Sequence, residues 1–209
     1  MNSLNKLTAD KLLRIKAIKL QPSNPFIWAS GWKSPIYCDN RKILSYPSVR
    51  NFVKLELGRL ILENFEEVDA IAGVATGAIA PGALIADALG LPFVYVRSTP
   101  KDHGLENMIE GDLKPRSKVV VVEDLVSTGS SSLKAVDAIR NDGSEAIGMV
   151  AVFTYGFPIA EEKFKKANIS LKTLTDYDAV LQEALRIDYI DESELETLQE
   201  WRKSPEDWK

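Results

Sequence analysis

Short apolar runs separated by helical stretches occupy the middle of the chain. These runs are rich in Val, Ile and Ala without polar alternation, which is typical of strands buried on both faces. We expect strands at residues 70–75, 93–96, 119–122 and 148–153, and helices such as residues 78–89 and 131–140 between them. The β-α-β alternation predicts an α/β fold with a mainly parallel sheet and helices on both sides. Ligands then belong at the carboxyl ends of the strands.

The N-terminal part of the chain has the pattern of two helices. Residues 4–18 place Leu and Ile at helical spacing between charged residues, which predicts an amphipathic helix. A second helix is expected to run from Pro47 to about Asn64, with Ser45 as its N-cap.

Two further helices are expected near the C-terminus, at residues 175–185 and 193–202. Ser193 and Glu196 have the spacing of a capping box. Because the chain has 209 residues and 45% hydrophobic composition, we expect one well-packed domain, residues 1–209, with residues 175–209 as a C-terminal helical elaboration.

Composition and charge narrow the function classes. The 26 Lys and Arg against 30 Asp and Glu give a net charge of -4, without the basic excess that binding to a nucleic-acid backbone requires. A single cysteine, Cys38, excludes an internal disulfide framework and fits a reducing compartment. The N-terminus has neither the apolar core of a signal peptide nor the length of a membrane span. We therefore expect a cytoplasmic protein with no nucleic-acid or membrane partner and no metal site formed by a Cys/His cluster.

The stretch VVVVEDLVSTGSSS, at residues 119–132, carries the candidate chemistry. Its valines predict a buried central strand whose end delivers Glu123 and Asp124 to the ligand crevice. Thr128, Gly129, Ser130 and Ser131 then form a turn at the start of the next helix, where free backbone N–H groups and the helix dipole favour an anion.

The ligand of this stretch has to carry groups of different chemistry, because the hydroxyls suit a phosphate whereas the two carboxylates would repel a phosphate. The lysine of an ATP-binding P-loop is missing, so a monophosphate is the better guest. Carboxylates accept hydrogen bonds from vicinal sugar hydroxyls and stabilise positive charge on the sugar. We infer a ribose 5-phosphate group. The alternative is that two acids merely end a strand and Ser and Thr merely cap a helix, which explains either half of the motif but not both together.

The same string resembles the 5-phosphoribosyl 1-diphosphate (PRPP) signature of type I phosphoribosyltransferases. PFIWASGWKSPIYCDNR at residues 25–41, ILSYPSVR at 43–50 and RSTPKDHG at 97–104 are similar to the orotate phosphoribosyltransferase family. The resemblance implies the type I phosphoribosyltransferase fold, with residues 1–45 as a small N-terminal hood segment. It also implies a pentosyltransferase of UMP biosynthesis that converts PRPP and orotate to orotidine 5'-monophosphate and pyrophosphate, with Mg²⁺ arriving on PRPP.

Site residues also follow from the resemblance. The basic segment at 97–104 is implied to close over the pyrophosphate, often in the neighbouring subunit's site, which implies a homodimer with shared active sites. Lys101, His103 and Asp124 are the expected catalytic residues, and no direct protein ligand of a metal is expected. The full set of expected PRPP contacts is Arg97, Lys101, His103, Glu123, Asp124, Leu125, Val126, Ser127, Thr128, Gly129, Ser130 and Ser131.

Orotate recognition is less fully specified. Ser127 matches the position of the base-contacting hydroxyl, and Lys33 or Arg41 is a candidate partner of the orotate carboxylate. The chain departs from some family members at Ala29 and at residues 154–156, where those members carry cationic residues.

The segment VATGAIA, residues 74–80, also differs from the family pattern. Gly73 and Gly77 bracket a strand-to-helix turn there, and they serve either the diphosphate or close backbone packing.

Two other functions share the PRPP apparatus. One is a phosphoribosyltransferase acting on a purine or on another pyrimidine. The second is a non-catalytic PRPP sensor that regulates transcription, and the negative net charge together with the lack of a recognisable DNA-binding module is evidence against it. The chain's only histidine, His103, and the neighbouring Lys101 favour catalysis.

Overall fold

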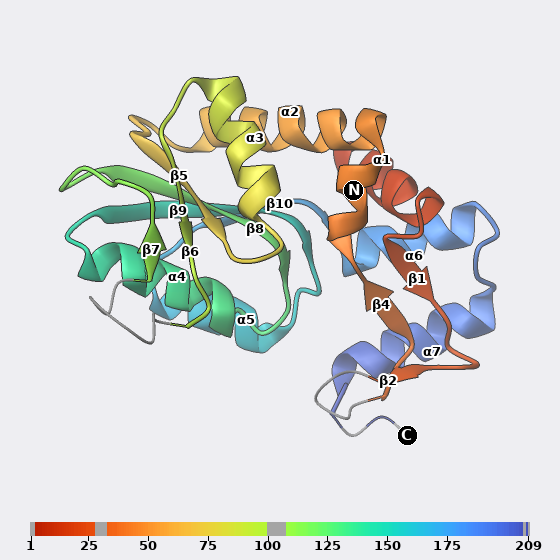
Figure 1. The fold of residues 1–209 in the computed structure, drawn as a ribbon. Helices are drawn as coiled ribbons and strands as arrows, with labels where there is room; N and C mark the ends of the chain where they lie inside the picture. The colour runs from red at the N-terminus through yellow and green to blue at the C-terminus, as the bar shows by residue number, and fades with distance from the viewer. Residues whose placement is uncertain (1–2, 28–32, 100–107, 207, 209) are drawn as a thin grey trace. The chain divides into compact units, whose positions relative to one another are not determined.

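The computed structural model describes residues 3–27, 33–99, 108–206 and 208 (Figure 1). The chain divides into two compact units. One is continuous, Pro47–Leu174, and the other combines the two ends of the chain, Met1–Tyr46 and Thr175–Lys209. Each unit is described by itself below.

A six-stranded sheet forms the centre of the continuous unit, in the order β10-β9-β8-β5-β6-β7. β5 pairs in parallel with β6 and β8, and β8 pairs in parallel with β9, whereas β7 is antiparallel to β6. The turns that follow the four parallel strands therefore meet at one edge of the sheet. The strands are β5 (Ala70–Val74), β6 (Phe93–Val96), β7 (Ile109–Glu110), β8 (Lys118–Val126), β9 (Glu145–Thr154) and β10 (Leu171–Asp176).

Helices cover both faces of this sheet. Figure 1 shows α2 (Pro47–Asn64) and α3 (Ile79–Leu89) on one face and α4 (Ser130–Asn141) and α5 (Pro158–Lys166) on the other. The side chains of Val119, Val120, Val121 and Val122 are fully buried between these layers, at 0% exposure. The predicted central strand of four valines, buried on both faces, is thus confirmed.

The other unit joins the N-terminal helix α1 (Ser3–Arg14) to α6 (Tyr177–Arg186) and α7 (Glu192–Lys203). Thr175 Oγ1 donates a hydrogen bond to the Asn5 carbonyl (2.9 Å), and Tyr177 Oη donates to the Leu198 carbonyl (2.8 Å). Two small antiparallel sheets pair β1 with β4 and β2 with β3. The remaining elements are β1 (Ile18–Leu20), β2 (Phe26–Ile27), β3 (Lys33–Ser34), β4 (Ile36–Cys38) and the 3-10 helix η1 (Asn40–Ser45).

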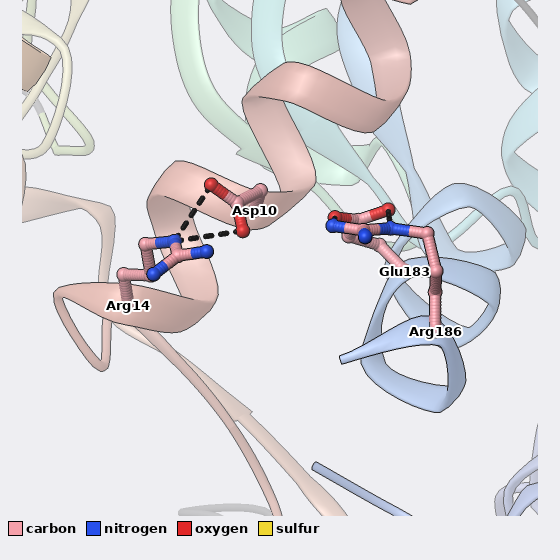
Figure 2. Close-up of polar contacts among 4 residues, drawn as sticks. All are labelled: Asp10, Arg14, Glu183 and Arg186. Atoms are coloured by element: carbon pink, nitrogen blue, oxygen red, sulfur yellow. Dashed lines mark hydrogen bonds and ion pairs between the residues drawn. The ribbon is translucent and has the colours of Figure 1, made fainter. Parts of the chain in front are cut away.

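Two ion pairs lie along the groove between α1 and α6 (Figure 2). Arg14 Nε donates to both carboxylate oxygens of Asp10 at 2.8 Å, and Arg186 pairs with the buried carboxylate of Glu183 at 2.5 Å. Each pair joins residues of one helix, so the pairs order the rim of the groove without crossing it. Among the residues that the structure describes, no helix is long and apolar enough to span a membrane.

Three predictions about helix ends and caps were wrong for reasons that the local hydrogen bonds show. α1 ends at Arg14 rather than Ile18, because Lys16 takes a left-handed conformation (φ 55°) and Ala17 N–H closes the helix by bonding to the Leu12 carbonyl. This is the hydrogen-bond arrangement of a Schellman motif, with lysine where glycine is usual. Ile18 instead begins β1.

The other two errors concern helix caps. Ser45 is the last residue of η1, so it does not cap α2, which begins at Pro47. The capping box of α7 is formed by Asp191 and Glu194, two residues before the predicted pair. Asp191 accepts from the Glu194 N–H at 2.8 Å, which places the start of the helix earlier than Ser193.

Candidate active site

The candidate site is built where β8 ends and α4 begins. Residues 127–129 form the turn, and Gly129 is the residue before the helix, with a left-handed backbone (φ 75°). β8 continues to Val126, beyond the predicted run of valines, so Glu123 and Asp124 lie within the strand rather than after it. Both carboxylates are therefore fixed by the sheet, and the hydroxyls that follow are fixed by the helix.

Glu123 is a buried acid, with 5% of its surface exposed. Its Oε1 accepts a hydrogen bond from the Asp124 backbone N–H (3.0 Å), and its Oε2 accepts one from Ser132 Oγ (3.0 Å). Burial raises the pKa of Glu123 well above its ordinary value of 4.5, and the adjacent charge of Asp124 raises it further. Glu123 therefore ties the end of β8 to the first turn of α4.

Asp124, the next residue along β8, is half-buried. Its Oδ1 accepts a hydrogen bond from the Leu125 N–H at 2.8 Å. A Cβ atom built on Gly77 would overlap the Asp124 carboxylate, so the turn between β5 and α3 lies directly against this acid. The neighbouring strand ends thus bring the divergent segment at residues 74–80 to Asp124.

Both glycines of that turn are at close approaches. A Cβ atom on Gly73 would lie 2.6 Å from the Ala78 carbonyl oxygen, which is too close for any side chain. Ala75 N–H donates to the Val96 carbonyl (2.8 Å), which ties the turn to the end of β6, and the Ala75–Thr76 peptide is cis. Gly73 serves backbone packing, and Gly77 makes room for Asp124.

The hydroxyl-bearing residues differ in exposure. Ser127 and Thr128 are half-buried, and Ser131 is exposed. Thr128 Oγ1 and Ser130 Oγ lie 3.3 Å apart. The Val126 side chain, in contrast, is fully buried in the core, so only backbone atoms of this residue could reach a ligand.

α5 supports the turn from a separate part of the chain. A Cβ atom on Gly129 would lie 2.9 Å from Phe164 Cε2, so the aromatic ring packs on the bare glycine. Lys163 Nζ, on the same helix, donates a hydrogen bond to Ser130 Oγ at 2.7 Å. Sequence reasoning missed Lys163, because it stands in the highly charged run EEKFKK, which reads as a solvated helix face.

The other predicted residues fall into two groups. Arg97 directly follows β6, its backbone N–H donates to the Met108 carbonyl (2.8 Å), and its side chain lies 3.5 Å from Glu110. Lys101 and His103 lie outside the described residues, as does Ala29.

Lys33 and Arg41 belong to the unit formed by the chain ends, whereas the turn after β8 belongs to the continuous unit. Lys33 is exposed, and its carbonyl accepts a hydrogen bond from Trp201 Nε1 at 3.3 Å. Arg41 pairs with Asp39 at 2.6 Å. The hydrogen bond from this guanidinium lowers the pKa of Asp39. Within residues 3–27, 33–99, 108–206 and 208, no group of three or more His, Cys, Asp or Glu side chains is placed to hold a metal ion.

Comparison with known proteins identifies the family. Residues 53–183 match the protein family described as Phosphoribosyl transferase domain. The chain is 72% identical over 208 residues to the orotate phosphoribosyltransferase of Bacteroides thetaiotaomicron, in an alignment covering 100% of this chain and 98% of that protein. The chain belongs to the orotate phosphoribosyltransferase family. A second orotate phosphoribosyltransferase, from Porphyromonas gingivalis, is 69% identical over 208 residues, covering 100% and 99% of the two chains.

Solved structures of the orotate phosphoribosyltransferase family share the fold. The crystal structure of the orotate phosphoribosyltransferase from Aeropyrum pernix superimposes with a TM-score of 0.76 at 26% identity, covering 88% of this chain and 99% of that chain. The resemblance read from the sequence and the predicted α/β phosphoribosyltransferase fold are both confirmed.

Proposed function

We propose that PRPP binds at the turn after β8, with its ribose at Asp124 and its 5'-phosphate at residues 127–131. As an orotate phosphoribosyltransferase, the chain is a glycosyltransferase of pyrimidine biosynthesis that transfers the 5-phosphoribosyl group to orotate and releases pyrophosphate. One observation carries the placement: within a few residues, a half-buried carboxylate at a strand end is followed by the N-terminus of a twelve-residue helix. A phosphorylated sugar needs the carboxylate at its ribose end and the helix N-terminus at its phosphate end.

The phosphate end is served by α4. Its first backbone N–H groups have no partner within the helix, and the helix dipole adds about 0.3 to 1 kcal/mol per anionic charge. Gly129 permits the left-handed backbone that begins the helix, and the Ser127, Thr128, Ser130 and Ser131 hydroxyls supply further donors. The turn contains no lysine of the kind that binds the longer phosphate chain of ATP in a P-loop, which favours a monophosphate.

The ribose end is served by Asp124. In the reaction, the bond from the anomeric carbon to the diphosphate oxygen breaks with its electron pair leaving on pyrophosphate, and a nitrogen of orotate, which gives up its proton to solvent, forms the new bond. Positive charge develops on the ribose as this happens, and a carboxylate fixed before the reaction stabilises it without reorganising. Leu125 N–H holds one Asp124 oxygen in place, and the bare Gly77 backbone leaves room for the other. Glu123 contributes mainly by fixing the strand end, since both of its oxygens accept hydrogen bonds from the protein.

We treat Mg²⁺ as part of the substrate, entering as the Mg–PRPP complex. Mg²⁺ keeps several waters and prefers phosphate oxygens, so it needs no full cage of protein ligands. The carboxylates of Glu123 and Asp124 are the acidic groups beside the turn, and the buried, hydrogen-bonded Glu123 is the poorer candidate for direct contact. Bound Mg²⁺ would neutralise part of the negative charge of the leaving diphosphate.

The remaining contacts complete the proposal. Ser127 contacts the base, Lys33 or Arg41 pairs with the orotate carboxylate, and Lys101 and His103 close over the pyrophosphate from the neighbouring subunit of a homodimer. These assignments rest on the motif resemblance, and Arg97 at the end of β6 marks where the closing segment starts.

A panel of bases tests the substrate assignment. The protein is incubated with PRPP, Mg²⁺ and either orotate, uracil, hypoxanthine, guanine or adenine, and pyrophosphate release is measured. We expect turnover with orotate and little with the other bases. Robust turnover of a purine without turnover of orotate would overturn the proposal and favour a purine phosphoribosyltransferase. Ligand binding without turnover of any base would favour the regulatory alternative.

A further inference from the structure

Lys163 lies outside the signature, yet its side chain is bonded directly to one of the signature hydroxyls. Lys163 Nζ donates to Ser130 Oγ at 2.7 Å, although the two residues are 33 positions apart. Phe164, the next residue on α5, packs on Gly129. The contact is therefore held by the packing of α5 against the turn.

The direction of this hydrogen bond fixes the polarity of the Ser130 hydroxyl. An ammonium group has three donors and no acceptor, so the Ser130 oxygen has to accept from Lys163. The single proton of the hydroxyl is then left for another acceptor, either Thr128 Oγ1 at 3.3 Å or a ligand oxygen at the N-terminus of α4. The positive charge behind Ser130 also polarises the O–H group, which strengthens it as a donor.

Lys163 also places a full positive charge beside the turn. Within the described part of the chain, Ser130 is the hydrogen-bond partner of Nζ, and no carboxylate lies within ion-pair distance of it. The side chain is half-buried, so its charge is only partly screened by solvent. The turn itself contains no cationic residue, so this charge is an addition to the donors of the signature.

We propose that Lys163 is a positioning residue for the 5'-phosphate of PRPP, acting through the Ser130 hydroxyl and through its own charge. The inference rests on the proposed placement of the 5'-phosphate at residues 127–131. Lys163 acts on binding at the phosphate end of the substrate and has no part in bond breaking at the anomeric carbon, which lies at the Asp124 end.

The test compares Lys163→Met, Lys163→Arg and the matched control Lys166→Met, which removes an exposed lysine from the same helix. We expect Lys163→Met to raise the KM for PRPP by about tenfold, the scale of one charge-assisted hydrogen bond, with kcat and the KM for orotate changed less than about twofold. Lys163→Arg should recover part of the loss, and Lys166→Met should match wild type. Because the lysine is partly exposed, Tm should change by no more than about 2 °C.

Two product-like inhibitors separate the ends of the site. Ribose 5-phosphate carries the 5'-phosphate without the diphosphate, and pyrophosphate carries the reverse. Lys163→Met should weaken inhibition by ribose 5-phosphate and leave inhibition by pyrophosphate unchanged, which a general loss of structure would not do. Equal weakening of both inhibitors, or of neither, would overturn the inference.

Variants of the turn distinguish this inference from the proposed function. If the turn holds the phosphate, Thr128→Ala and Ser131→Ala should weaken inhibition by ribose 5-phosphate, whatever the role of Lys163. If these variants have no effect, the placement of the phosphate fails. If they weaken binding and Lys163→Met does not, only the role of Lys163 fails. The double variant Lys163→Met/Ser130→Ala should lose less binding free energy for ribose 5-phosphate than the sum of the losses in the two single variants. Full additivity would contradict action through Ser130.

Discussion

Two adjacent acids on β8 have opposite surroundings. Glu123 is enclosed and bonded to Ser132, whereas Asp124 is half-buried beside Gly77. The two acids differ in burial, since Glu123 has only 5% of its surface exposed and Asp124 lies against the turn that contains Gly77. Under the proposed placement of PRPP, these two carboxyl groups have different tasks: Glu123 holds the strand end, and Asp124 meets the ribose.

Replacing Glu123 by Gln should change how stability depends on pH. The raised pKa of Glu123 means that the folded protein holds this proton more tightly than the unfolded chain. The contribution of Glu123 to stability is thus complete below its ordinary value of 4.5 and is lost as pH rises through the raised value. Glutamine does not titrate. As pH rises from the ordinary value of 4.5 through the raised pKa, the free energy of unfolding of wild type should therefore fall relative to that of Glu123→Gln. Urea unfolding at a series of pH values measures this, with the exposed Glu200→Gln as control, and parallel curves for wild type and Glu123→Gln would contradict it.

Replacing Asp124 by Asn should damage catalysis far more than folding. The amide has the same size and removes the negative charge at the ribose, so we expect kcat to fall by roughly a hundredfold or more. The Tm should stay close to that of wild type. Asp137→Asn, on the exposed face of α4, is the matched control. Wild-type turnover in Asp124→Asn would show that this carboxylate does not act on the reacting sugar.

Candidate PRPP contacts could be singled out from the sequence because they stand in one continuous string. Acids, glycine and hydroxyls each carry a distinct chemistry, and their order matches the order of groups in a phosphorylated ribose. Lys163 could not be predicted in this way, because its relation to Ser130 exists only after α5 has packed beside α4. A lysine among other charged residues gives no local signal of what it contacts.

At the scale of elements, the turn after β8 is clamped between two helices. Glu123 ties it to α4 through Ser132, and Phe164 of α5 packs on Gly129. The structure thus holds the backbone N–H groups at the start of α4 in a fixed arrangement before any ligand binds. Such preorganisation reduces the ordering that binding would otherwise require.

Gly129→Ala should therefore lower the free energy of unfolding by more than backbone strain alone would. Gly129 has a left-handed backbone, and a Cβ atom would also meet Phe164 at 2.9 Å. Gly90 has a similar backbone (φ 67°), and a Cβ atom there would meet no neighbouring group within 4 Å, so Gly90→Ala measures the backbone strain by itself. That strain is about 1 kcal/mol. We expect Gly129→Ala to lower the free energy of unfolding further and to raise the KM for PRPP, whereas Gly90→Ala should leave this KM unchanged. Equal stability losses in the two variants would show that Phe164 yields without cost.

Several of the longer elements were predicted near their observed bounds, whereas α5, β10 and the two-residue strands were not predicted. The run Phe93–Val96 matches β6 residue for residue, because all four of its residues are apolar or aromatic and favour a strand. β2 and β3 have two residues each, which is too short for any period to be read. The end of α1 was missed because Lys16, rather than glycine, takes the left-handed position.

At the scale of the whole molecule, the proposed homodimer predicts complementation. Lys101→Ala and Asp124→Asn should each inactivate the protein alone. If the segment carrying Lys101 closes over the neighbouring subunit's site, a mixed dimer places both lesions in one site and leaves the other intact. Mixing the two variants should then restore a fraction of wild-type activity, measured as pyrophosphate release. Lack of rescue after subunit exchange has been verified by mass spectrometry would show that each chain closes over its own site.

The grouping of the chain ends into one unit was beyond what the sequence pattern predicts. Residues 1–45 and 175–209 were expected as separate attachments, but α1 contacts α6 and both ends belong to one unit. Contacts such as that between Asn5 and Thr175 join positions 170 residues apart. Amphipathic patterns indicate that a helix has an apolar face, and they do not indicate which distant helix covers it.

This arrangement sets the order in which the two units become complete during synthesis. Residues 47–174 form a continuous unit, so its segments are synthesised one after another, and only the last two residues of β10 follow Leu174. α1 precedes the continuous unit in the sequence, and its packing partner α6 follows that unit. Until α6 has been made, the apolar side chains of Leu12 and Leu13, which are almost fully buried in the finished protein, lack the partner that covers them. The packing of α1 is therefore completed only after the continuous unit that separates it from α6 in the sequence has been made.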